Sequence, residues 1–217
     1  MISVNTRAAA LVERMIADSE ALGLGLTRLR NGSTLIDAGI EAPGSLQAGR
    51  LFARACMGGL GQVRFTQQTL GGDADLWLPA VAVSVSHPPI ACMASQYAGW
   101  AVPGSKRSYL GSGPARALAV EEDIFQKLNY RDRAETAVLM LEGREFPDEE
   151  VASYAAEKCA VSPERLFLVI APTASLVGSV QIAARAAETG MHKMMELGVD
   201  ILRVTAAASL CPLAPVA

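Results

Sequence analysis

The chain has 217 residues, a length that suits one large domain or two small ones with a buried core. Hydrophobic residues make up 51% of the chain and aromatic residues only 5%, so aliphatic side chains form most of the core, as in helices packed on sheets. The formal net charge of −3 excludes the strongly basic surface that nucleic-acid binding requires.

The four cysteines (Cys56, Cys92, Cys159 and Cys211) are far apart and form no CxxC pair or Cys/His cluster. Structural zinc is therefore not expected. The start of the chain lacks the regions of a secretory signal, and no apolar run reaches the roughly 20 residues of a membrane helix. We expect buried free thiols, a cytoplasmic location and no contact with a membrane.

The first quarter of the chain predicts a helix, a hairpin and a second helix. Apolar residues recur at helical spacing after Asn5 or Thr6, either of which can cap a helix. Asn31-Gly32 stands between two apolar runs and predicts a β-hairpin with a type I′ turn. A helix is expected over residues 46–57, and Gly58-Gly59 ends it.

The middle of the chain favours strands, separated by a Gly-Gly-Asp turn at residues 71–73 and a His-Pro-Pro turn at 87–89. The expected strands lie in residues 62–70, 77–86 and 90–102. A Gly-Ser-Gly-Pro turn then leads into a helix expected over residues 115–128.

The last part of the chain alternates strands and helices. The sequence predicts a strand at 137–141, a helix from Pro147-Asp148 to Cys159, a strand at 166–171, a helix at 178–197 and a strand at 201–206. Residues 33–67 and 166–206 share one plan of strand, loop, helix, Gly and strand, which indicates a duplicated α/β unit. Unrelated units of this kind also look alike, so both explanations remain open. The fold class is mixed α/β.

A row of polar side chains lies on the predicted helix 178–197. Gln181, Arg185, Glu188 and His192 follow one another at spacings of four, three and four, which places them on one helix face. Such a face is often only solvated, with Arg185 and Glu188 as a surface pair. The preceding loop carries Thr173 and Ser175, and Ser179 follows in the first turn. Hydroxyls and free N–H groups at a helix N-terminus after a buried strand favour a ligand cleft.

Two further segments carry candidate binding residues. The Gly-rich turn with Ser112 and Gly113, followed by Arg116, could hold a phosphate or carboxylate, although such a turn is usually only a loop. The segment Ser95-Gln96-Tyr97 could stack on a flat ring, and a core strand fits it equally well. His192 is more often a packed histidine than a catalyst.

Six stretches of the chain, in order, carry a family resemblance. They are "SVNTRAAALVERMI", "NGSTLIDAGIEAPGSLQAGRLF", "ACMASQYAGWAV", "GSGPARALA", "APTASLVGSVQIAARAAETGMHKMMELGVDILRV" and "PLAPVA". Together they resemble the methenyltetrahydromethanopterin cyclohydrolases of methanogenic archaea and of bacteria that oxidise one-carbon compounds. Members of that family continue well past the segment similar to "PLAPVA", so the family's C-terminal part is expected to be missing here.

The resemblance implies two packed α/β units with a substrate cleft between them, expected to span residues 1–110 and 111–217. It also implies a homo-oligomer. It implies reversible hydrolysis of the methenyl pterin to the formyl pterin, as in methanogenesis or formaldehyde oxidation, without a metal or organic cofactor. The Arg-x-x-Glu pair of the family matches Arg185 and Glu188, with Glu188 as general base. The expected substrate-binding residues are Ser95, Gln96, Tyr97, Ser112, Gly113, Arg116, Thr173, Ser175, Ser179 and Gln181. The alternative is a shortened, non-catalytic pterin-binding or assembly protein of the same ancestry.

Overall fold

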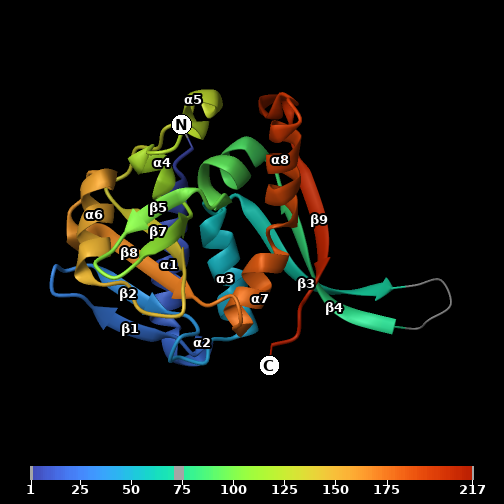
Figure 1. Cartoon of the computed structure of the whole chain (residues 1–217). Coiled ribbons are helices and arrows are strands. Elements are labelled where there is room, and N and C mark those ends of the chain that lie inside the picture. The colour runs from blue at the N-terminus through green and yellow to red at the C-terminus, as the bar shows by residue number, and fades with distance from the viewer. Residues whose placement is uncertain (1, 71–75, 217) are drawn as a thin grey trace.

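The computed structural model describes residues 2–70 and 76–216, and in this part the strands form two sheets (Figure 1). The helices are α1 (Val4–Ala17), α2 (Ser19–Leu22), α3 (Leu46–Cys56), α4 (Arg116–Ala119), α5 (Ile124–Leu128), α6 (Glu149–Cys159), α7 (Leu176–Ala183) and α8 (Ala186–Glu196). A π-helix, η1 (Pro89–Gln96), and two 3-10 turns, η2 (Pro163–Arg165) and η3 (Ile201–Arg203), complete the helical elements of this part. The predicted mixed α/β class is confirmed.

The larger sheet has six strands in the order β1-β2-β8-β7-β6-β5. Their bounds are β1 (Gly25–Arg28), β2 (Thr34–Asp37), β5 (Trp100–Pro103), β6 (Ser108–Ser112), β7 (Ala137–Glu142) and β8 (Leu166–Ala171). The three strands β2, β8 and β7 run parallel and are flanked by antiparallel strands. Their side chains are buried on both faces, against α1 and α3 on one side and α6 on the other. The continuous apolar runs of β7 and β8 match this double covering.

The smaller sheet has three antiparallel strands in the order β3-β4-β9, with bounds Gly61–Leu70, Leu76–Val85 and Ala207–Pro212. One cluster of buried apolar residues joins it to η1, α5, α7 and α8. Helix α3 packs against α7, and the two lie side by side in the centre of Figure 1. Gly49 permits this approach, because a Cβ there would lie 2.7 Å from the Cβ of Val180.

Several local predictions are confirmed. The Asn31-Gly32 hairpin pairs β1 with β2, although its turn is not type I′ because only Gly32 has a positive φ. Helix α3 begins after Ser45, whose hydroxyl accepts the N–H of Ala48, and Asp148 caps α6 in the same way. The cap of α1 is different from the prediction: Ser3, not Asn5 or Thr6, accepts the N–H of Thr6.

Longer predictions were wrong where the chain changes direction. Residues 90–96 are not a strand but belong to η1, and the predicted helix 115–128 is divided into α4 and α5 by Val120, at φ 54°. The predicted helix 178–197 is two helices that meet at Ala184-Arg185. The last strand is residues 207–212, not 201–206, because pairing with β4 selects that segment. The Gly-Gly-Asp turn at 71–73 lies outside the described residues.

The shared plan of residues 33–67 and 166–206 has a partial counterpart in space. Strands β2 and β8 are parallel neighbours, helices α3 and α7 pack together, and β3 and β9 flank β4 on its two edges. Common ancestry of the two segments stays a prediction. Each sheet takes strands from both sides of residue 110, so the predicted division at that residue does not follow the sheets and also stays a prediction.

Candidate functional site

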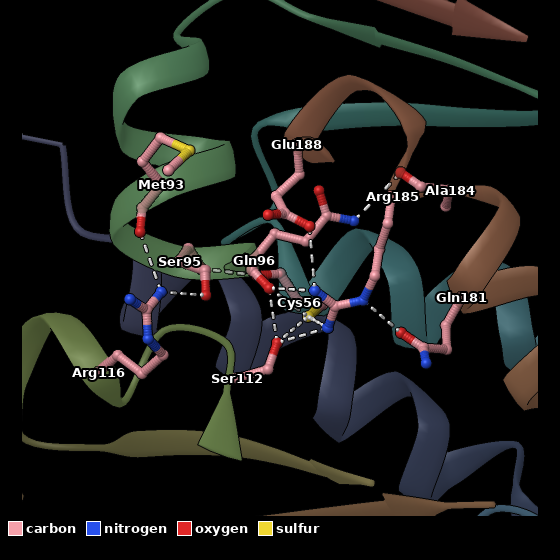
Figure 2. A network of polar contacts seen from close by, with 10 residues as sticks. All are labelled: Cys56, Met93, Ser95, Gln96, Ser112, Arg116, Gln181, Ala184, Arg185 and Glu188. Carbon is pink, nitrogen blue, oxygen red and sulfur yellow. Dashed lines mark hydrogen bonds and ion pairs between the residues drawn. The ribbon is translucent and has the colours of Figure 1, made fainter. Parts of the chain in front are cut away.

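Arg185 lies at the break between α7 and α8, where its guanidinium is held by three parts of the chain (Figure 2). Its Nε donates to Oε1 of Gln181 at 3.0 Å, and one terminal nitrogen donates to the backbone oxygen of Gln96 at 2.7 Å. The same nitrogen lies 3.3 Å from Oε2 of Glu188, and the other terminal nitrogen donates to Oγ of Ser112 at 2.9 Å. The guanidinium is therefore fixed in position.

The Arg185–Glu188 pair is not a solvated surface pair. The exposed fraction of the side chain is 19% for Arg185 and 8% for Glu188. The predicted row is preserved across the helix break: Gln181 and Glu188 both contact Arg185, and His192 stacks on Tyr97 with ring centroids 5.0 Å apart. The prediction of a packed His192 is confirmed.

Burial changes the acid–base properties around Arg185. Burial raises the pKa of the Glu188 carboxyl above its ordinary value, although the nearby charge and hydrogen bond of Arg185 act in the opposite direction. A carboxyl whose pKa is raised holds a proton more readily than an exposed one, which suits a group that accepts and returns a proton. Burial also raises the pKa of the Cys56 thiol, so this group remains protonated and is not a nucleophile.

Ser112 links Arg185 to the end of η1. Its hydroxyl donates to the backbone oxygen of Gln96 at 2.7 Å and lies 2.9 Å from Sγ of Cys56 at the end of α3. Ser95 donates to the backbone oxygen of Cys56 at 2.6 Å. The next residue after Ser112, Gly113, has a φ of 91° and donates its N–H to the backbone oxygen of Ser95. The predicted residues of the segments 95–97 and 112–113 therefore contact one another next to Arg185.

Arg116 is completely buried and is held away from the small pocket beside Arg185. Two of its nitrogens bind the two carboxylate oxygens of Glu122, each at 2.7 Å, and a third donates to the backbone oxygens of Met93 and Ser95. Its guanidinium also faces the ring of Tyr97 at 5.1 Å. These contacts give Arg116 a structural role in holding η1, and a role in binding substrate stays a prediction.

A small pocket opens at Arg185. Its lining residues come from α3, the segment before β5, β6, β7 and α7, and they are Phe52, Ala98, Leu110, Ser112, Met140, Leu141, Glu142, Gln181 and Arg185. Among the predicted binding residues, Ser112 and Gln181 reach this pocket. It presents one arginine, one carboxylate (Glu142) and two neutral polar groups beside apolar surface, and polar groups set in apolar surface are the usual lining of small-molecule sites.

The predicted residues of the loop before α7 have partners within the chain. Ser175 caps α7, since its hydroxyl accepts the N–H of Gly178 and donates to the backbone oxygen of Pro172. Ser179 donates to the backbone oxygen of Ala214. Thr173 is half-buried. The loop therefore builds the helix start and holds the segment after β9, and binding of ligand by these residues stays a prediction.

Two residues that contact the predicted site residues were missed by the sequence prediction. Cys56 contacts Ser112, and Glu122 holds Arg116. Neither residue is in a recognisable motif, and both contacts depend on how α3, η1 and α4 meet. In the described part of the chain, no helix is long and apolar enough to cross a membrane.

A buried Arg/Glu pair beside a pocket, on a mixed α/β scaffold, is an arrangement found in enzymes that act by acid–base chemistry on small molecules. Comparison with known proteins gives the family. The family described as cyclohydrolase (MCH) matches residues 3–217. This chain belongs to that cyclohydrolase family.

Individual relatives agree with this assignment. The chain is 44% identical to the methenyltetrahydromethanopterin cyclohydrolases of Methanococcus maripaludis strain S2 and of Methanocaldococcus jannaschii, and 39% identical to that of Methanococcoides burtonii. Each match covers 100% of this chain and 67% of the relative. The difference in length that the resemblance implied is confirmed.

Proposed function

We propose that this chain catalyses the reversible hydrolysis of methenyltetrahydromethanopterin to formyltetrahydromethanopterin in one-carbon metabolism, with Glu188 and Arg185 as its catalytic residues. The names of the relatives support the reaction. The observation that carries the assignment of residues is the buried contact of 3.3 Å between Arg185 and Glu188, beside a pocket that Arg185 lines.

The chemistry requires a placed water and a proton acceptor. The methenyl carbon of the substrate is bonded to two nitrogens, carries positive charge and is already electrophilic. The water oxygen forms a bond to this carbon while Glu188 takes one water proton. The intermediate then loses its second oxygen-bound proton as one carbon–nitrogen bond breaks, and the leaving nitrogen receives a proton from Glu188. The net change consumes one water and releases one proton with the neutral formyl product.

Arg185 contributes through position and charge. Its contact with Glu188 orients the carboxylate, and its guanidinium can stabilise negative charge that develops on the attacking oxygen. Since the substrate supplies its own positive charge, we propose that the reaction uses no metal and no organic cofactor. Ser112 and Gln181 are the first candidates for contact with the pterin, because both line the pocket.

We also propose that the protein acts in the cytoplasm as a homo-oligomer. Apolar side chains on α7 and β9 are solvent-exposed in the single chain: Leu176 at 39%, Ile182 at 46% and Leu210 at 46%. Burial of such side chains in a subunit contact is favourable. Light scattering of the purified chain tests the oligomer, and a monomer at micromolar concentration would contradict it.

The substitution Glu188→Gln tests the catalytic assignment. Removal of a general base is expected to lower kcat about 10²–10⁴-fold, followed by the loss of methenyl pterin absorbance. Glu196→Gln is the matched control, because Glu196 is on the same helix but is exposed and pairs with Lys193. Near-normal turnover in Glu188→Gln would refute the assignment. Tight pterin binding without turnover by the wild-type chain would instead support the non-catalytic alternative.

A further inference from the structure

Gln96 has a buried side chain whose amide nitrogen donates a hydrogen bond and whose amide oxygen accepts none. The residue is 1% exposed at the end of η1, and its Nε2 donates to the backbone oxygen of Ala184 at 3.2 Å. Its Oε1 is buried and has no donor within the described residues. A buried acceptor without a donor is destabilising, so a hydrogen bond donated to Oε1 would stabilise the molecule.

The Gln96 amide lies where the helix is broken. The oxygen of Ala184, which would accept an N–H from Glu188 in an unbroken helix, accepts the Gln96 amide instead. The backbone oxygen of Gln96 and Oε2 of Glu188 also share one nitrogen of Arg185, at 2.7 and 3.3 Å. Figure 2 shows both Gln96 and Glu188 against the Arg185 guanidinium. Because Gln96 and Glu188 meet at the same guanidinium nitrogen, a proton on Glu188 is a donor that can reach the Gln96 side chain.

We propose that Gln96 is a positioning residue whose Oε1 accepts a hydrogen bond from the protonated carboxyl of Glu188. The role of this bond in turnover rests on the function proposed above. When Glu188 has taken the proton of the attacking water, Oε1 of Gln96 holds that proton in place. The proton then passes to the leaving nitrogen as the carbon–nitrogen bond breaks, and Oε1 again has no donor.

The groups around Glu188 come from several elements, and each favours either the charged or the neutral form of its carboxyl. Arg185, His192 and Arg116 favour the charged carboxylate. Burial favours the neutral acid, and the pKa of the carboxyl is raised overall. The thiols of Cys56 and Cys92, from α3 and η1, also face Glu188, but both are held protonated by burial. An amide oxygen beside the carboxyl favours the neutral acid as burial does.

The test measures the titration of Glu188 itself, by carbon NMR of protein labelled with ¹³C at the glutamate carboxyl. The missing resonance in Glu188→Gln assigns the signal. In Gln96→Met the acceptor is lost and the neutral acid is no longer favoured, so the midpoint is expected to fall by about 0.5–1 pH unit. Gln96→Glu places a second carboxyl there, so the Glu188 midpoint is expected to rise. Gln47→Met, an exposed change on α3, is the control and should leave it unchanged.

The two variants give opposite signs. Gln96→Met tests the hydrogen bond itself; if that variant does not fold, Gln96→Glu still tests whether side chain 96 lies next to Glu188, because the absence of a rise overturns the proposal. A Glu188 midpoint that stays the same or rises in Gln96→Met, or that does not rise in Gln96→Glu, overturns it. The acid limb of kcat/KM should move with the NMR midpoint. The titration requires no turnover, so a chain that fails to hydrolyse the pterin but shows the shift refutes the proposed function and not the Gln96–Glu188 bond. Lower activity in Gln96→Met with no shift would indicate a merely structural role.

Discussion

Replacement of Arg116 by Met is expected to destabilise the chain strongly. Arg116 is fully buried, and its partner Glu122 has a side chain only 13% exposed. The change removes four hydrogen bonds, two to Glu122 and one each to the backbone oxygens of Met93 and Ser95. Breaking a buried ion pair from one side leaves an uncompensated charge and costs about 3–5 kcal/mol.

The magnitude can be checked by thermal and urea unfolding. In a chain of this length about 3–5 kcal/mol corresponds to a fall in Tm of about 6–20 °C. The double variant Arg116→Met, Glu122→Gln should recover a large part of the loss, because no unpaired charge is then buried.

A matched control exists in a neighbouring ion pair. Lys158 contacts Glu121 at 3.0 Å, with both side chains 34% exposed. Lys158→Met should leave the Tm nearly unchanged, because water solvates the Glu121 carboxylate that remains. Equal losses in Arg116→Met and Lys158→Met, or no recovery in the double variant, would refute the reasoning that burial makes the Arg116 pair important.

Three further predictions concern single residues. Burial tends to raise the pKa of Asp37, but four backbone N–H donors lower it below 3.8. Asp37→Asn should therefore destabilise the chain at pH 7 and much less as the pH falls below about 4, as measured by urea unfolding. Because the pKa of Glu188 is raised, the folded state holds the proton to higher pH than the unfolded state, and the free energy of unfolding falls as the pH rises from 4.5 through the folded pKa. Glu188→Gln should therefore be more stable than the wild type above this pH range and equally stable below it. A difference that is the same at all pH values would contradict this. Gly113→Ala should lower the free energy of unfolding by about 1–3 kcal/mol, because the new Cβ would lie 2.6 Å from Cγ of Met140. Gly198→Ala is the control: Gly198 has a φ of 81° but open space around it, so the loss of stability in the same thermal melt should be smaller.

Much of the local structure could be predicted because the responsible contacts are close in the chain. Ser45 and Asp148 cap the helices that follow them through bonds to residues three positions away. Gly32 permits the turn between β1 and β2. The apolar runs of β7 and β8 indicate strands covered on both faces. Each of these signals is contained within a few consecutive residues.

The failed predictions depend on distant partners. The segment 90–96 is apolar and could form a strand, but it becomes the π-helix η1, whose end is held by Arg116 and Ser112. The break at Ala184 is occupied by the amide of Gln96, 88 residues away. Residues 207–212 become a strand because β4 offers them an edge. Helical spacing and strand propensity carry no information about these partners.

The proposed catalytic pair shows the same division. The sequence by itself determined that Arg185 and Glu188 lie on one side of a helical segment, since residues three apart are neighbours on a helix. Only the tertiary structure decided that this side is buried, that Ser112 and the backbone of Gln96 hold the guanidinium, and that Glu188 is removed from water. The reason is physical: burial and pKa depend on which elements pack against a side chain, and those elements come from parts of the chain far away in sequence.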